Sequence, residues 1–236
     1  MNVIITGASR GIGRELAKRY SKKAHKIYAV ARNEKKLKEL AKEFKNIEPV
    51  VLDLANLEDV RKFGKSVKNV DLVICNGAIS LPHSPSFTPF EDFKKTFDIN
   101  FLSIHALLEG VVPNMKKGKI VLISSLASLI GAPSSMPYSA SKRALNSYAQ
   151  SLRNLLAPDI EVINILPGFI KTDMTVKNDF YMPFLMELEE GVDEIQKAIE
   201  KGYKEYAFPK RLYYLIKLFN MLPLSLQDKV LQKVAK

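Results

Sequence analysis

A glycine-rich turn near the start of the chain restricts the fold more than any other feature of the sequence. The apolar run at residues 3–6 leads directly into Gly7, Gly11 and Gly13, and a helical pattern follows as far as Tyr20. Glycine allows a tight turn off a strand at Gly7, a close backbone approach to a ligand at Gly11, and close packing of helix on strand at Gly13. The helix N-terminus then offers free N–H groups and a positive dipole end to phosphates. The pattern predicts a strand, turn and helix that bind a pyrophosphate; the alternative is a structural junction without a ligand.

Short β-branched runs alternate with longer helical patterns along the rest of the chain. The helical segments carry apolar residues three and four apart, as at Leu37, Leu40 and Phe44. Such alternation predicts right-handed crossovers and a parallel sheet covered on both faces. Apolar residues make up 47% of the chain, enough to fill a core, so we expect one α/β domain with a doubly wound parallel sheet over residues 1–208. The expected strands are residues 3–6, 26–30, 49–52, 71–75, 120–124 and 161–166.

The composition limits the kinds of site that the chain can form and the cellular compartment that suits it. Cys75 is the only cysteine, and the three histidines, His25, His83 and His105, lie far apart, so we expect no intramolecular disulfide and no metal site. With no basic leader before the first apolar run, we expect a cytoplasmic protein. The net charge of +11 suits an anionic partner or a lysine-rich solvated surface. We expect no nucleic-acid partner, because lysines and glutamates mix on the helical patterns and no reading element is recognisable.

Tyr138 and Lys142 form the most informative polar pair, because residues four apart share one face of a helix. A free phenol has a pKa of about 10. A nearby ammonium lowers that pKa towards the range useful for proton transfer. Ser125 follows the expected strand at residues 120–124 and lies thirteen residues before Tyr138. Residues 80–89, rich in proline, and residues 167–191, which could form a flexible lid, also follow strands, at the sheet edge where ligands bind.

These residues together give the chain its resemblance to a known family. The turn reads Thr-Gly-x3-Gly-x-Gly, Tyr138 and Lys142 stand in Tyr-Ser-Ala-Ser-Lys, and Asn100, Ser125, Tyr138 and Lys142 follow in order. From residue 2 to about 207 the chain resembles the short-chain dehydrogenase/reductase family. The resemblance implies a Rossmann-type fold and hydride transfer between a nicotinamide cofactor and a small carbonyl or alcohol substrate. It also implies a homo-oligomer, a dimer or tetramer; a non-catalytic cofactor-binding regulator or scaffold on the same fold is the alternative.

The resemblance also implies a role for each member of this set of four. Ser125 would hold and polarise the substrate carbonyl, and Tyr138 would give a proton to its oxygen. Lys142 would bind the nicotinamide ribose and tune the phenol of Tyr138. Asn100 would help to hold a water in the proton relay.

The residue after the second expected strand selects the cofactor in dinucleotide folds, where a carboxylate favours NAD and a basic residue favours NADP. Here Arg32 takes that place, no carboxylate comes before Glu34, and Arg10 lies inside the glycine turn. Two guanidiniums near one phosphate predict NADP(H). At residues 75–78 the chain has Cys-Asn-Gly-Ala where the family usually has Asn-Asn-Ala-Gly, so Cys75 replaces the first Asn. The cofactor-binding residues implied are Gly7, Ser9, Arg10, Gly11, Ile12, Gly13, Arg32, Asp53, Leu54, Asn76, Gly77, Ala78, Tyr138, Lys142, Pro167, Gly168, Ile170 and Thr172.

Residues 209–236 are expected to form a helical C-terminal extension beyond the shared core. Residues 212–222 are apolar on nearly every face, and residues 225–236 place lysines on one side. Six Lys or Arg residues stand against Asp228 alone. An apolar run of eleven residues is too short to cross a bilayer, which needs about twenty. Three placements are open: over the substrate cleft, against a second subunit, or in the plane of a membrane. Packing on the protein itself or on a partner subunit is the expectation.

Overall fold

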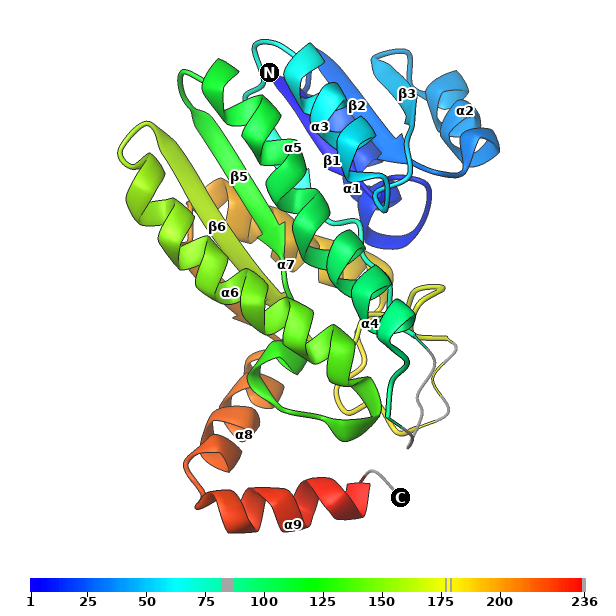
Figure 1. Cartoon of the computed structure of the whole chain (residues 1–236). Coiled ribbons are helices and arrows are strands. Elements are labelled where there is room, and N and C mark those ends of the chain that lie inside the picture. The colour runs from blue at the N-terminus through cyan, green and yellow to red at the C-terminus, as the bar shows by residue number, and fades with distance from the viewer. Residues whose placement is uncertain (82–86, 177, 179, 235–236) are drawn as a thin grey trace.

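The computed structural model describes residues 1–81, 87–176, 178 and 180–234, and its centre is one seven-stranded sheet (Figure 1). All neighbouring strands are parallel, in the order β3-β2-β1-β4-β5-β6-β7. The chain winds outward from β1 to β3 and then returns to place β4 on the other side of β1. The doubly wound parallel sheet expected from the sequence is confirmed. The strands are β1 (Asn2–Thr6), β2 (Lys26–Ala31), β3 (Ile47–Val51), β4 (Leu72–Cys75), β5 (Gly118–Ile123), β6 (Ile160–Pro167) and β7 (Glu205–Phe208).

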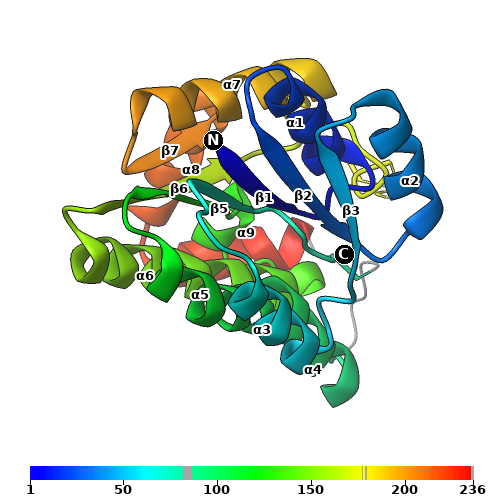
Figure 2. The same ribbon diagram turned by 90° about the horizontal axis from the view of Figure 1, so that it is seen from above.

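Helices cover both faces of the sheet, as Figure 2 shows from above. On one face pack α1 (Gly11–Ser21), α2 (Glu34–Glu43) and α7 (Leu188–Lys201). The other face carries α3 (Leu57–Ser66), α5 (Ser103–Val111) and α6 (Met136–Leu156), and α4 (Phe90–Phe97) packs against α6 on the same side. Successive strand residues point to opposite faces, so Val3 and Ile5 enter one core and Ile4 enters the other. A strand buried on both faces must be apolar throughout, which explains the continuous apolar runs of the sequence.

Strand β7 is the one strand that the sequence analysis did not predict. Its four residues pair with β6, with Ala207 opposite Leu166 and Phe208 opposite Pro167. Only Ala207 and Phe208 are buried in it, while Glu205 is exposed. The apolar run in it is only three residues long, at 206–208, which is too short to indicate a strand.

Two helices follow β7, α8 (Lys210–Asn220) and α9 (Leu224–Val234). They lie beyond the carboxyl ends of β5 and β6, below the sheet in Figure 1. Helix α8 buries Leu212 and Ile216 in a small cluster with Leu126, Leu166 and Ala207. Among the described residues, no helix combines the length and the apolar character needed to cross a membrane.

Candidate active site

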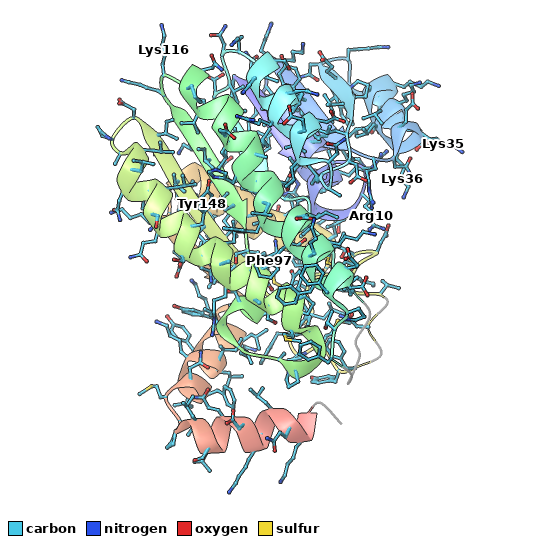
Figure 3. All side chains as sticks on the ribbon, viewed as in Figure 1. Arg10, Lys35, Lys36, Phe97, Lys116 and Tyr148 are labelled. Atoms are coloured by element: carbon cyan, nitrogen blue, oxygen red, sulfur yellow. The ribbon has the colours of Figure 1, made fainter. Side chains whose placement is uncertain are left out.

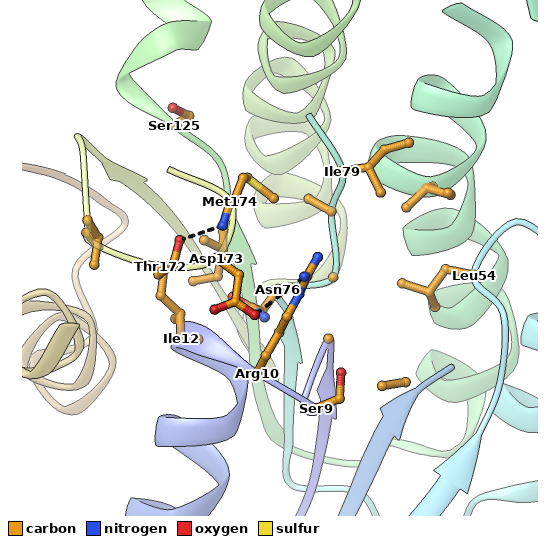
Figure 4. Close-up of a pocket in the computed structure, with 18 of the residues that line it drawn as sticks. Ser9, Arg10, Ile12, Leu54, Asn76, Ile79, Ser125, Thr172, Asp173 and Met174 are labelled. Atoms are coloured by element: carbon orange, nitrogen blue, oxygen red, sulfur yellow. Dashed lines mark hydrogen bonds and ion pairs between the residues drawn. The ribbon is translucent and has the colours of Figure 1, made fainter. Parts of the chain in front are cut away.

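A cavity of about 560 Å³ opens at the carboxyl ends of the strands, beside the switch in strand order between β1 and β4. Ser9 and Arg10 stand at one end of it and Ser125 at the other (Figure 4). The structure therefore brings together segments that the sequence separates by more than a hundred residues. Apart from Gly13, every residue expected to bind the cofactor lines this cavity: Gly7, Ser9, Arg10, Gly11, Ile12, Arg32, Asp53, Leu54, Asn76, Gly77, Ala78, Tyr138, Lys142, Pro167, Gly168, Ile170 and Thr172.

The glycine turn has the conformation that its residues allow. Gly7 and Gly11 have positive φ angles of +71° and +52°, where side chains with a Cβ are strained. Gly13 lies behind the turn instead of in the cavity wall. A Cβ added to Gly13 would be 2.4 Å from the carbonyl oxygen of Gly7, so glycine is needed there for helix packing. Helix α1 thus begins against the cavity with free N–H groups.

The end of β4 is tied to the end of β1 by hydrogen bonds around Thr6. The Thr6 hydroxyl accepts from the backbone N–H groups of Asn76 and Gly77, at 3.0 and 2.9 Å. The Asn76 amide donates to the Thr6 carbonyl oxygen at 3.0 Å. Cys75, which takes the place of the family's first Asn, is fully buried, and burial raises the pKa of its thiol to about 12. Cys75 is therefore a neutral core residue, and the Asn76 amide supplies a side-chain bond between the two strands.

Three cationic side chains line the cavity, one from the glycine turn and two from the segment that follows β2. Arg10 pairs with Asp173 across 3.5 Å, and Arg32 lies 3.9 Å from Asp53. Both guanidiniums are half-exposed and remain open to a ligand. Lys36 also lines this end and was missed by the sequence analysis. The sequence did hold a sign of this position, because Lys36 follows Arg32 by four residues and lies in the first turn of α2.

The hydroxyls of Ser125 and Tyr138 meet at the other end of the cavity. Ser125 is the second residue after the end of β5. Its Oγ accepts a hydrogen bond from the backbone N–H of Ala127 at 3.1 Å, which fixes the rotamer of the Ser125 side chain. Tyr138 comes from the first turn of α6. Burial raises the pKa of Tyr138, and a hydrogen bond with Ser125 opposes that rise. The two side chains therefore lie near each other in the cavity wall, and the phenol is neutral.

Lys142 lies one helical turn beyond Tyr138, with its ammonium 5.8 Å from the centre of the phenol ring. The side chain is buried, and its Nζ donates to the carbonyl oxygen of Ile123 at 2.7 Å. Burial lowers the pKa of Lys142 to about 8. The sequence predicts that this ammonium lowers the pKa of Tyr138. The pKa of Tyr138 is instead raised, because burial dominates and Lys142 is held by the end of β5.

Asn100 stands apart from the cavity. It lies in a π-helical turn, Asp98–Leu102, between α4 and α5, and is fully buried. Its Oδ1 accepts from the N–H of Ile79 at 2.8 Å, and its Nδ2 donates to the carbonyl of Ile79 and to the hydroxyl of Ser141, at 2.9 and 3.2 Å. Asn100 therefore fixes the cavity wall at Ile79 against α6. Its expected part in a proton relay stays a prediction.

The segment after β6 forms one wall of the cavity. Thr175 organises it: its hydroxyl donates to the Ile170 carbonyl at 2.7 Å and accepts from the N–H of Thr172 at 2.9 Å. Residues 170–175 are thus a hydrogen-bonded turn within the segment 167–191, for which a flexible lid stays a prediction. Asp173, Met174 and Thr175 join the cavity lining, which only the folded turn reveals. His83, to which the sequence assigns no role, lies outside the described residues, and the described part holds no cluster of metal-ligating side chains.

Comparison with known proteins decides the family. The model of the family described as short chain dehydrogenase matches residues 1–180. The chain belongs to this family. An uncharacterized oxidoreductase of Myxococcus xanthus is 33% identical, over 98% of this chain and 96% of that protein. An 11-beta-hydroxysteroid dehydrogenase-like protein of Arabidopsis thaliana is 35% identical, over 85% of this chain and 69% of that one.

A solved structure extends the likeness over nearly the whole chain. It is a short chain dehydrogenase from Burkholderia cenocepacia in complex with NADP, with a TM-score of 0.84 and 25% identity. The alignment covers 97% of this chain and 96% of that one. The present chain is therefore an oxidoreductase of the short-chain dehydrogenase family, with a Rossmann-type fold.

Proposed function

We propose that this protein uses NADP(H) to interconvert a carbonyl compound and an alcohol, with Tyr138 as the proton donor. One observation carries the proposal. Ser125 and Tyr138 line one end of a cavity whose other end is the glycine turn and its cations, and the Ser125 side chain lies close enough to the phenol to affect its pKa. A dinucleotide laid across that cavity would join the phosphate-binding end to the proton-donating end.

The residues present fit NADP(H). The glycine turn and the N-terminus of α1 suit a pyrophosphate. Arg10, Arg32 and Lys36 all line the cavity and would hold a 2′-phosphate, and no carboxylate follows β2 directly. The Burkholderia dehydrogenase is in complex with NADP, which supports the same choice for this chain. We therefore assign the cationic end of the cavity to the adenosine 2′-phosphate.

The side chains at the other end can perform the proton chemistry. Bound NADPH would supply the hydride for reduction of the carbonyl carbon. The Ser125 hydroxyl would donate to the carbonyl oxygen and hold it beside Tyr138. Tyr138 would then give its proton to that oxygen, and take it back in the oxidative direction. Its raised pKa keeps the phenol protonated at neutral pH, as a donor must be.

Lys142 would serve both cofactor and phenol. An ammonium has three N–H donors, and one of them is occupied by the Ile123 carbonyl. The other two N–H groups of Lys142 would be free to donate to the hydroxyls of the nicotinamide ribose, on the side of the cavity that holds Tyr138. Since its pKa is about 8, Lys142 still carries its charge at pH 7. This charge would stabilise the phenolate left after proton transfer.

Oxidation of NADPH in the presence of a panel of aldehydes and ketones tests the proposal. We expect turnover with at least one carbonyl, and affinity for NADPH at least about tenfold above that for NADH, which needs only ~1.4 kcal/mol. Arg32→Asp should remove or reverse this preference, because it exchanges a phosphate partner for a repelling charge. Binding of NADPH without turnover of any carbonyl would favour a cofactor-binding regulator instead. Equal affinities for the two cofactors would reject the NADP(H) assignment.

A further inference from the structure

One end of the molecule carries most of its exposed large apolar side chains. In the described part there are nineteen such residues, and fourteen of them lie at residues 87–90, 176–185 or 214–230. These three segments belong to the end of the molecule towards which the strands point, where the cavity also opens (Figure 1). Isolated apolar residues on a surface are ordinary, but a concentration of this size marks an interaction site.

Helix α8 has two apolar faces, and only one of them is packed. Leu212 and Ile216 face the protein and are buried. Tyr214 and Leu218, four residues apart on the opposite face, are 62% and 63% exposed. Met221, at the end of the same stripe, is 81% exposed. The outer stripe therefore has no partner within the described chain, although burying each such side chain would stabilise the protein by about 1.5–3 kcal/mol.

Cations border this stripe. The five described cations of α8 and α9 are exposed, and none of them forms an ion pair within the described part of the chain: Lys210, Arg211, Lys217, Lys229 and Lys233. Asp228 is the only acid in the same two helices. In α9, Leu226 and Val230 share one face because they are four residues apart, and Lys229 and Lys233 border that face because each lies three residues after one of them. Such a helix suits the boundary between water and lipid, with its apolar face in the lipid and its lysines at the headgroups.

We propose that α8 and α9 dock on the surface of an anionic lipid bilayer. The outer stripe of α8 and the apolar face of α9 enter the headgroup boundary, and the five cations contact lipid phosphates. A second copy of this chain fits the surface less well, because a symmetric interface would bring together two sets of cations that form no ion pair among the described residues. Docking in the plane also agrees with the lack of a membrane-spanning helix among the described residues.

The docked helices are joined to the active site. The Asn220 amide of α8 donates to the Leu129 carbonyl at 2.9 Å, and Leu129 ends the short turn that begins directly after Ser125. Docking therefore places the end of the cavity that holds Ser125 and Tyr138 near the bilayer. If the proposed function is correct, the substrate is an apolar carbonyl compound drawn from the lipid phase. The docking itself does not rest on that function.

Sedimentation of the full chain with sucrose-loaded vesicles tests the docking. We expect binding to phosphatidylcholine vesicles that contain phosphatidylglycerol at low salt. High salt or pure phosphatidylcholine should weaken that binding, because charge attraction is lost. Leu218→Glu with Met221→Glu, and separately Lys229→Glu with Lys233→Glu, should each lower the partition coefficient at least about tenfold. These positions are exposed, so the melting temperatures should not change.

Two control variants lie away from the docking surface. Lys116→Glu with Lys117→Glu changes the charge at the opposite end of the molecule from α9, as the place of Lys116 in Figure 3 shows. Leu155→Glu changes an exposed apolar residue, 76% accessible, near the end of α6. Both controls should bind vesicles as the wild type does. The proposal is overturned if the intact protein stays in the supernatant with anionic vesicles at low salt. It is also overturned if sedimentation velocity shows a dimer that Leu218→Glu with Met221→Glu dissociates, because the occupant is then a second copy.

Discussion

Burial acts in opposite directions on the two residues that matter most for proton transfer. It raises the pKa of Tyr138, which stays neutral, and lowers the pKa of Lys142 to about 8. The sequence could predict that the two share a helix face, because a spacing of four fixes that. It could not predict the bond from Lys142 to the Ile123 carbonyl, since only the packing of α6 on β5 brings these atoms within 2.7 Å.

Replacement of Tyr138 by Phe tests the proton donor. The ring and its packing remain, but the hydroxyl is lost. With any substrate found, we expect kcat to fall by a factor of about 10² or more, the usual contribution of a positioned acid. The Kd for NADPH should change little, because the remaining wall of the cavity is intact. Stopped-flow turnover and cofactor titration measure the two effects; a kcat above about a tenth of the wild-type value would rule out Tyr138 as the acid.

The affinity for NADPH should depend on pH through Lys142. Burial disfavours the charged form, so the ammonium loses its proton as the pH rises through about 8, well below the ordinary value for lysine. The neutral amine donates more weakly to the ribose, so the Kd should be lowest below pH 8 and rise above it. Titrations across neutral and alkaline pH measure this. Lys142→Met should bind more weakly and show a flat profile over the same range; an unchanged profile would assign the titration to another group.

At the scale of elements, prediction from the sequence succeeded where a pattern is local. Six of the seven strands and the turn before α1 follow from apolar runs and from glycine spacing. Three features were missed. Strand β7 and the π-helical turn Asp98–Leu102 make contacts with distant segments, whereas the turn at residues 170–175 is held by local bonds of the Thr175 hydroxyl, which no apolar or glycine pattern indicates. The sequence also held no sign that Met174 and Ile79 line the cavity. Met174 reaches it through the folded turn at residues 170–175, and Ile79 is held in place by hydrogen bonds with Asn100.

The contact between α3 and α5 offers a test of this packing. A Cβ added to Gly110 would lie 2.5 Å from the backbone nitrogen of Lys65 and 2.6 Å from the carbonyl carbon of Gly64, so the helices would have to separate. Gly110→Ala should lower the free energy of unfolding by about 1–3 kcal/mol. Gly131→Ala is the matched control, because a Cβ there meets nothing within 4 Å. Urea unfolding of both variants measures the difference, and equal midpoints would contradict the close packing.

At the scale of the whole molecule, the C-terminal helices complete the end of the structure that carries the active site. The sequence predicted a helical extension, but a segment apolar on nearly every face does not reveal which face is packed. The fold decides this, because only Leu212 and Ile216 of α8 are buried against Leu126, Leu166 and Ala207. The expected packing of the extension on the protein therefore accounts for one face of α8, and the other remains exposed.

Two alanine substitutions in α8 separate these faces. Ile216 is 6% exposed within the cluster, so Ile216→Ala removes buried methyl groups and leaves a cavity. We expect it to reduce the free energy of unfolding by about 2–4 kcal/mol. Leu218 lies two residues along the same helix and is 63% exposed, so Leu218→Ala should change that free energy by less than about 0.5 kcal/mol. Thermal and urea unfolding of the full chain, without lipid, measure both values. Similar losses would mean that the outer stripe is covered in solution, and the two faces of α8 would then have no separate roles.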